Sequence, residues 1–224
     1  MKKKNIFFWF FLFIILTTFY FDFNKTKIAE TFKIKKIEIT GIKNVDRNLL
    51  NLKLEKFKYN NFFLINRNQI ASSIIDIDFI NKVFIKKIYP DKIEIKIKEH
   101  KIIGIIIENR NKYILREDGI IIKKYDNRFE TLPIIYGKEV KNYFPQFYKF
   151  LKEINFNVNE IESFKYFDTK RWDILLKNNK LIKLPSNKKE IKKSIIKFIS
   201  INKDKKFDKF KIFDFRVKNQ LIIK

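Results

Sequence analysis

The clearest pattern of apolar and polar positions lies at residues 92–99 (KIEIKIKE), where isoleucine occupies every second position from 93 to 97. This period of two predicts a strand with one buried and one wet face. Residues 83–88 form a second predicted strand, joined to the first by a turn at Tyr89-Pro90-Asp91. A third strand is predicted over residues 32–39 with a bulge at Lys35-Lys36, ended by Gly41.

Two short helices are predicted between the strand at 32–39 and the strand at 83–88. Asp46 can cap a helix that carries Leu49, Leu50 and Leu54, and a second helix begins near Asn66. The second helix aligns its apolar residues on one face, as expected if both helices cover the buried face of a small sheet. The predicted unit is β-α-α-β-β and spans residues 32–100.

Residues 101–224 read as a β-rich domain with flanking helices. One helix is predicted with Pro145 in its first turn, and a basic amphipathic helix is predicted after Asn187, where packing on a sheet is favoured over a membrane-surface role. The expected fold class is therefore α+β. The predicted strands are 102–107, 112–115, 120–124, 162–168, 172–177, 180–184, 210–215 and 221–223.

An uncharged apolar run extends from Ile6 to Phe21 and follows three lysines. It predicts a single transmembrane helix over residues 6–23, with residues 1–5 in the cytoplasm. A cleaved signal peptide is the alternative, but no small-residue cleavage pattern follows the run. The expected topology places the N-terminus inside and the bulk of the chain in the periplasm, anchored in the cell inner membrane.

The formal net charge of the chain is +25, which raises the possibility of a polyanionic partner. A nucleic acid or an anionic membrane surface would fit such a charge. However, only seven of the 50 basic residues are arginine, and Ile, Asn, Lys and Phe are abundant throughout. We therefore attribute most of the charge to compositional bias and expect no specific nucleic-acid binding.

Residues able to carry out catalysis are scarce. The chain has one histidine, His100, no cysteine and four scattered glycines, which leaves no transition-metal set and no phosphate-binding loop. No serine lies in a recognisable nucleophile motif, although a carboxylate pair formed in space stays possible. The sequence predicts no catalytic residue, no metal, no cofactor and no small-molecule substrate.

Several landmarks in fixed order resemble the FtsQ/DivIB family of bacterial cell division proteins. The longest is Val83 to Glu99 (VFIKKIYPDKIEIKIKE), preceded by Ile37-Glu38-Ile39-Thr40-Gly41 and the NFFLI segment at 61–65. The chain departs from the family at Tyr89, where tryptophan is usual, and at His100, where arginine is usual. The later landmarks are Asp118-Gly119, Leu132-Pro133 with Gly137, Arg171-Trp172-Asp173-Ile174, Leu184-Pro185 and Asp214-Phe215-Arg216.

The resemblance implies a POTRA domain at residues 32–100, an FtsQ-type β domain at 101–224, and a non-enzymatic role that links early and late division proteins at the septum. A C-terminal edge strand could add a partner's strand through main-chain hydrogen bonds, and the resemblance implies FtsB and FtsL as partners. The residues predicted for this contact are Phe215, Arg216, Val217, Gln220, Leu221, Ile222 and Ile223. A second predicted contact, on the POTRA sheet, uses Tyr89, Pro90, Lys92, Glu94, Lys96 and Lys98.

Two other function classes fit the same sequence. A different membrane-anchored POTRA protein would act as a chaperone or secretion accessory and bind extended clients. An anchored polyanion binder would lose affinity steeply with salt. A membrane-tethered hydrolase ranks last because no catalytic motif supports it.

Overall fold

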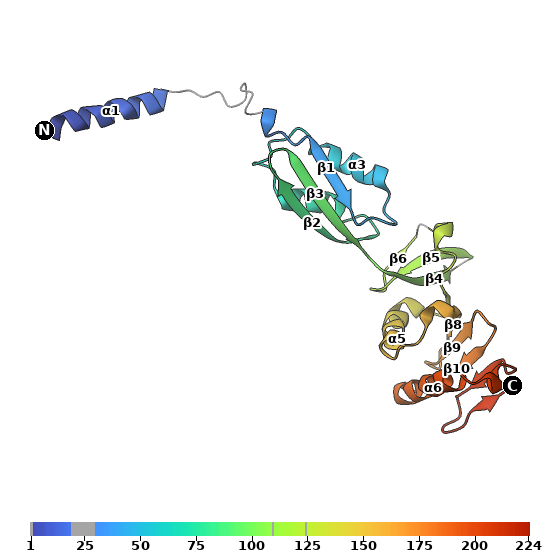
Figure 1. Cartoon of the computed structure of the whole chain (residues 1–224). Helices are drawn as coiled ribbons and strands as arrows, with labels where there is room; N and C mark the ends of the chain where they lie inside the picture. The colour runs from blue at the N-terminus through green and yellow to red at the C-terminus, as the bar shows by residue number, and fades with distance from the viewer. Residues whose placement is uncertain (1, 19–29, 109, 124) are drawn as a thin grey trace. The chain divides into compact units, whose positions relative to one another are not determined.

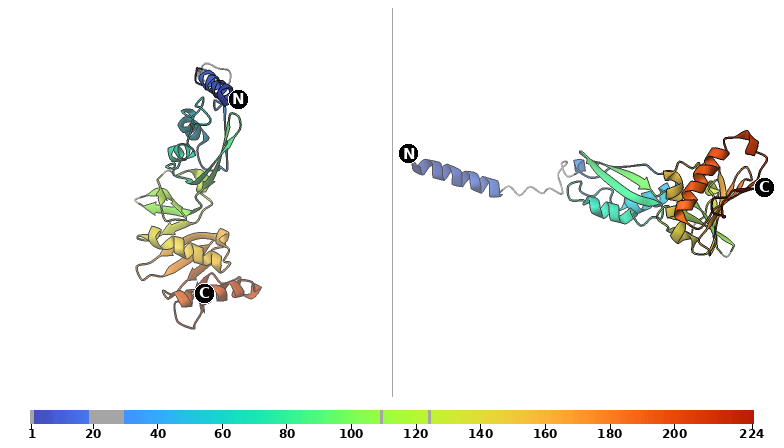
Figure 2. Two further views of the ribbon diagram at one scale, coloured as in Figure 1. Left: turned by 90° about the vertical axis from the view of Figure 1, so that its left-hand side faces the viewer. Right: turned by 90° about the horizontal axis from the view of Figure 1, so that it is seen from below.

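The computed structural model describes residues 2–18, 30–108, 110–123 and 125–224 (Figures 1 and 2). The chain divides into two compact units, Met1–Glu99 and His100–Lys224. The observed fold is α+β, with a small sheet in the first unit and a large sheet in the second.

Residues 6–18 of the apolar N-terminal run lie in helix α1 (Lys2–Thr18), which is 17 residues long. No helix within the described ranges has both the length and the apolar character that crossing a bilayer requires. Residues 19–23 of the predicted membrane span lie outside the described residues. The anchor therefore stays a prediction.

The first unit contains a three-stranded sheet of β1 (Lys36–Thr40), β2 (Ile80–Ile88) and β3 (Lys92–Glu99), in the order β1-β3-β2. β3 pairs with β1 in parallel and with β2 as a hairpin. Helices α3 (Arg47–Glu55) and α4 (Arg67–Ile74) connect β1 to β2. The predicted cap at Asp46 is confirmed, because its side chain accepts a hydrogen bond from Asn48 N (2.8 Å). The second helix begins where it was predicted, and Asn66 caps it by accepting from Asn68 N (2.9 Å).

The alternation in β3 sorts the sheet into a buried and an open face, as predicted. Ile93, Ile95 and Ile97 are at most 3% exposed and belong to one core cluster with the helix residues. Their partners from α3 and α4 are Leu50, Leu54, Ile70 and Ile74.

The predicted strand at 32–39 is wrong in its first half. β1 begins only at Lys36, and residues 32–34 pair instead with the α3–α4 connection, where Phe62 N donates to Phe32 O (2.8 Å) and Ile34 N donates to Asn60 O (3.0 Å). Ile34 is fully buried by this pairing. The two consecutive lysines that interrupt the alternation mark this change of partner. Lys35 N and Lys36 N both donate to Asp91 O (2.9 and 3.3 Å), so two residues face one on the partner, as in the predicted bulge.

Glu99, the last residue of β3, closes the loop that follows β1. Its carboxylate accepts hydrogen bonds from the backbone N–H groups of Lys43 (2.6 Å), Asn44 (2.9 Å) and Val45 (3.1 Å), and from Asn44 Nδ2 (2.8 Å). Sequence reasoning placed Glu99 only as a strand end. The structure shows that it satisfies the donors of a whole turn.

We expect Glu99→Gln to lower the stability of the first unit by about 1–3 kcal/mol, because a neutral amide leaves backbone donors without a charged acceptor. Faster amide hydrogen exchange at Asn44 and Val45 would report the loss directly. Glu94→Gln on the same strand is the matched control: Glu94 forms an exposed ion pair with Lys92 (3.0 Å), and its loss should cost less than about 1 kcal/mol. Equal effects of the two substitutions would contradict the assigned role of Glu99.

The second unit is built on a nine-stranded sheet with the order β12-β11-β10-β9-β8-β7-β4-β5-β6. Helices α5 (Val140–Glu153) and α6 (Lys188–Ile201) connect β7 to β8 and β10 to β11. The strands are β4 (Ile102–Glu108), β5 (Asn111–Arg116), β6 (Ile121–Ile122), β7 (Ile134–Tyr136), β8 (Ile161–Tyr166), β9 (Trp172–Leu176), β10 (Leu181–Lys183), β11 (Ile212–Asp214) and β12 (Ile222–Ile223). Short 3-10 turns lie at Asn127–Phe129, Val158–Glu160 and Lys205–Phe207.

Both long helices contribute to one core with the sheet. Phe144 and Phe147 of α5 and Ile195 and Phe198 of α6 are buried in the same cluster as Trp172, and the remaining members come mainly from β4, β7, β8, β9, β10 and β11. The predicted packing of the basic α6 helix on the sheet is confirmed, as is its cap, because Asn187 accepts from Lys189 N (2.9 Å).

Two predictions in this unit need correction. α5 begins at Val140, so Pro145 lies inside the helix and not in its first turn. The longer helix buries Val140 and Phe144, which offsets the backbone hydrogen bond that proline cannot donate. The three-residue strand β7 was not predicted, because its parallel neighbours β4 and β8 are remote in sequence.

Candidate partner-binding edge

Strand β12 forms one end of the nine-stranded sheet, as predicted for the C-terminal segment. It pairs antiparallel with β11, with Ile223 opposite Phe213 and Ile222 opposite Asp214. No other described strand pairs with it. The predicted strand at 221–223 is thus confirmed except at Leu221, and β12 offers a sheet edge to a partner.

The direction of the backbone groups on β12 follows from its hydrogen bonds. Ile212 N donates to Lys224 O (3.0 Å) and Lys224 N donates to Ile212 O (3.1 Å), so these two residues form a hydrogen-bonded pair. In an antiparallel ladder the adjacent residue turns its N–H and C=O to the other side. The N–H and C=O of Ile223 therefore point away from β11, where an added strand would lie.

The first unit also has a strand at a sheet edge, β2, but its sequence is less suited to accept a partner. β2 carries Lys82, Lys86 and Lys87, and charged side chains of this kind discourage pairing at natural sheet edges. β12 consists of two β-branched residues. This contrast favours β12 over β2 as an edge that takes up another strand.

The seven predicted contact residues do not all reach the surface. Ile222 is 41% exposed and Val217 is 47% exposed, whereas Leu221 and Ile223 pack partly against the core. Phe215 is only 5% exposed and belongs to the core cluster. Phe215 was predicted to flank the partner, but its buried side chain can only support the edge from within the core.

Arg216 and Asp214 form a close ion pair at the start of the turn that leads to β12. The guanidinium Nε donates to both carboxylate oxygens (2.9 and 3.0 Å) and Nη2 donates to Oδ2 (2.6 Å). Asp214 Oδ1 also accepts from the backbone N of Arg216 (3.0 Å). These hydrogen bonds from Arg216 hold the pKa of Asp214 below its usual value.

A lowered pKa means that the unfolded chain binds this proton at a higher pH than the folded chain. The stabilisation by Asp214 is therefore complete above about pH 4 and is lost as the pH falls further. We expect Asp214→Asn to accelerate amide exchange at Arg216 at pH 7. Asp126→Asn is the control, because Asp126 makes the same pair with Arg128 (3.0 Å) on an exposed turn far along the chain from β12. Unchanged exchange at Arg216 would refute the role of the pair.

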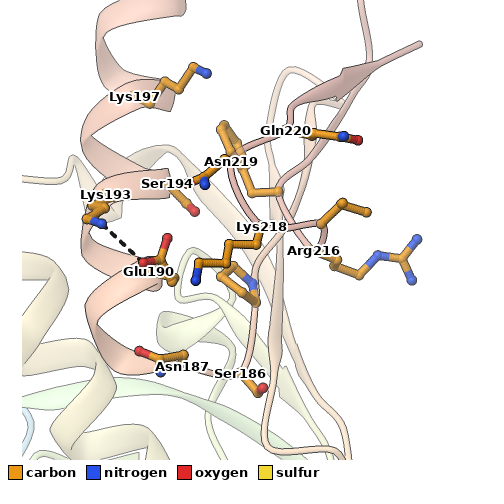
Figure 3. A pocket seen from close by; sticks show the side chains of 13 residues that line it. Ser186, Asn187, Glu190, Lys193, Ser194, Lys197, Arg216, Lys218, Asn219 and Gln220 are labelled. Carbon is orange, nitrogen blue, oxygen red and sulfur yellow. Dashed lines mark hydrogen bonds and ion pairs between the residues drawn. The ribbon is translucent and has the colours of Figure 1, made fainter.

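A hollow of about 500 Å³ lies between α6 and the turn at residues 215–220. Figure 3 shows Lys218 and Asn219 directed toward α6, whereas Arg216 and Gln220 point away from it. Lys193 of α6 is paired with Glu190 (3.1 Å). Apart from Arg216, the charged residues that line the hollow are Glu190, Lys193, Lys197 and Lys218. Three of these four are cationic, so the lining favours an acidic ligand segment.

A row of alternating charges crosses the sheet and ends at β12. Lys165 of β8 is opposite Asp173 of β9, which is opposite Lys183 of β10, and Lys183 is opposite Asp214 of β11. The next position is Ile222. Burial raises the pKa of Asp173, although Arg171 and Lys183 oppose this. Sequence reasoning missed the row, because the register of β10 and β11 depends on the intervening helix α6.

The POTRA residues predicted as a second contact lie on the central strand of their sheet and in its hairpin turn. Lys92, Glu94, Lys96 and Lys98 share the open face of β3, and Tyr89 is 60% exposed beside Pro90 in the turn. Because β3 is paired on both sides, it can offer side chains but no free backbone. Hydrogen bonds from Lys36 and Lys92 lower the pKa of Glu38 on the same face to about 2.

The lone histidine lies near Arg116 and Asp118. His100 Nε2 contacts Arg116 Nη2, and burial together with the Arg116 charge lowers the pKa of His100. In the part of the chain that the structure describes, no three His, Cys, Asp or Glu side chains are grouped to hold a metal ion.

Comparisons with known proteins give a consistent result. Residues 32–100 match the POTRA domain of FtsQ type, and residues 105–216 match the C-terminal region of the cell division protein FtsQ/DivIB. The chain is 28% identical over 207 residues to the cell division protein FtsQ of Rickettsia bellii, covering 89% of this chain and 76% of the relative. It is 26% identical over 194 residues to that of Rickettsia conorii (86% and 72%), and 28% identical over 112 residues to that of Rhizobium meliloti (49% and 36%).

Proposed function

The chain belongs to the FtsQ/DivIB family of cell division proteins, and from this premise we propose that it is a non-enzymatic scaffold of the division septum. It links early and late division proteins through contacts outside the cytoplasm. The proposed organisation is a cytoplasmic N-terminus (1–5), a single membrane anchor in the inner membrane (6–23), a POTRA domain (32–100) and a β domain (101–224). The bulk of the chain is periplasmic.

The free edge of β12 is the observation that carries the proposed mechanism. An FtsB–FtsL pair adds a strand beside β12 and bonds to the outward backbone groups of Ile223. The exposed side chains of Val217 and Ile222 contact the added strand, and the basic hollow beside α6 receives acidic side chains of the same partner.

Depletion of the protein tests the role in division. Loss of a septal scaffold gives filamentous cells, whereas loss of a chaperone or secretion accessory gives envelope defects in cells that still divide. Capture of membrane proteins by the full chain in detergent, followed by identification, tests the partners. Recovery of unrelated extended clients instead of FtsB and FtsL would overturn the proposal, and binding that depends on salt but not on partner identity would indicate a polyanion binder.

The POTRA sheet makes a second proposed contact, with other membrane-embedded division proteins, through Tyr89, Pro90 and the charged residues of β3. Its support is the exposure of Tyr89 at the hairpin turn. Replacing Tyr89 and Pro90 together should reduce recruitment to the septum. Intact recruitment of that variant would remove this contact from the mechanism.

A further inference from the structure

Four aromatic rings gather at one end of the POTRA sheet. Tyr89 lies 5.6 Å from Phe32, 5.3 Å from Phe62 and 5.4 Å from Phe63 between ring centroids, and Phe32 and Phe63 are 5.1 Å apart. We call these four residues, together with the neighbouring Leu64, the aromatic tip. They come from three separate segments: the entry to β1, the α3–α4 connection and the β2–β3 turn.

Only part of the aromatic tip serves the core. Phe62 is 4% exposed and packs with the core of this unit, whereas Phe63 is 53%, Tyr89 is 60% and Leu64 is 83% exposed. A single exposed apolar side chain needs no explanation, but a contiguous apolar group at a loop end commonly marks a contact surface. The buried Phe62 anchors the tip to the core, and the exposed residues of the tip are free to contact a membrane or a protein.

The tip lies where the chain enters the POTRA sheet. Lys36, the first residue of β1, is opposite Lys92, the first residue of β3 after the turn, and Phe32 is itself part of the tip. Eleven residues, 19–29, separate α1 from the next described residue. A fully extended chain of that length spans at most about 40 Å, so the tip is confined to the neighbourhood of the proposed anchor.

Cationic side chains surround the aromatic tip. Lys87 Nζ lies 5.5 Å from the centroid of the Phe62 ring and donates to Phe62 O (2.8 Å). Burial and the neighbouring charge of Arg67 lower the pKa of Lys87. Lys33 and Lys35 flank Ile34, each near an acidic side chain, Glu30 and Asp91. Aromatic and aliphatic side chains ringed by Lys and Arg are the combination that binds at the headgroup level of an anionic bilayer.

We propose that the aromatic tip inserts Phe63 and Leu64 into the headgroup region of the leaflet that holds the anchor, with the neighbouring cations bound to anionic lipid. This inference rests on the proposed membrane anchor. Contact at both α1 and the tip orients the POTRA sheet against the membrane, so that β3 runs away from the bilayer toward Glu99. The strand rises by roughly 3.3 Å per residue, so Lys98 lies about 20 Å farther from the tip than Lys92 does.

The test uses the absence of cysteine in the chain, which allows a single labelled site. Full-length Leu64→Cys and Lys98→Cys proteins are labelled with an environment-sensitive fluorophore and reconstituted into vesicles of phosphatidylglycerol and phosphatidylcholine. Both positions are exposed on the POTRA domain. Spin-labelled lipids carrying the quencher near the headgroup should quench the label at position 64 at least threefold more than the label at position 98.

Further experiments test whether the quenching at position 64 depends on anionic lipid and on the neighbouring lysines. Vesicles of phosphatidylcholine alone, or Lys33→Glu with Lys35→Glu, should reduce quenching at position 64 by half or more. Equal quenching at positions 64 and 98 in anionic vesicles would overturn the inference. A label at position 64 that responds only when a division protein is added would also overturn it, because the tip would then bind a protein and not lipid. Protein that alkaline carbonate strips from the vesicles would instead show that the anchor proposal has failed.

Discussion

Removal of residues 217–224 is expected to abolish capture of an FtsB–FtsL pair by the full chain. The deletion takes away β12 and the exposed side chains beside it, and so removes the proposed docking edge. It spares Phe213 and Phe215, which are buried in the core, so the β domain should stay folded with only a modest loss of stability. Pull-down of purified full-length protein in detergent, with circular dichroism as the folding control, measures both effects.

Substitution at Ile223 isolates the backbone contribution to the same contact. Ile223→Pro removes the N–H that points away from β11 and places a ring where a partner strand would bond, and proline is tolerated at sheet edges. Ile223→Ala keeps this donor while removing the side chain that packs on the core. We expect the proline variant to bind at least tenfold more weakly than the alanine variant. Equal affinities would show that strand addition at β12 is not the mode of binding.

Trp172→Ala is expected to cause the largest loss of stability in the second unit, about 3–5 kcal/mol. Trp172 is 5% exposed and stacks on Phe147 with a centroid distance of 4.6 Å and an interplanar angle of 2°. Its ring also lies 5.8 Å from Phe144 and 4.6 Å from Tyr166. Truncation therefore leaves a cavity between α5 and β9 that rigid neighbours cannot fill.

Urea denaturation followed by far-ultraviolet circular dichroism should show the transition of the second unit at a lower midpoint in this variant. Fluorescence is unsuitable, because Trp9 is the one remaining tryptophan. The control is Tyr136→Ala on β7, where a side chain that is 41% exposed should contribute about 1 kcal/mol or less. A similar midpoint for both variants would show that the Trp172 stack is not the centre of this core.

Local sequence signals identified the elements that local chemistry determines. The alternation at 92–99 predicted β3 (Lys92–Glu99) with both ends correct, and the side chains of Asp46, Asn66 and Asn187 mark helix starts that the structure confirms. Errors arose where distant pairing decides the outcome. Residues 32–34 bond to the α3–α4 connection, and β7 exists because β4 and β8 lie on either side of it.

The candidate edge was foreseeable in position but not in detail. The apolar Leu221-Ile222-Ile223 segment predicted a final strand, yet nothing local indicated that Phe215 turns into the core. The charge row through Asp173, Lys183 and Asp214 depends on parallel pairing between β10 and β11. The connection between these two strands, residues 184–211, is 28 residues long and contains α6. Such a register cannot be read from one sequence.

The short length of β12 limits the lifetime of a complex formed at this edge. Two strand residues expose few outward amide and carbonyl groups, each contributing about 0.5–1.5 kcal/mol to a complex. Dissociation is then governed by side-chain contacts and by how densely the membrane crowds both proteins together. For the proposed docking at β12, we therefore expect occupancy to fall with the local concentration of the two proteins, without any dedicated release step.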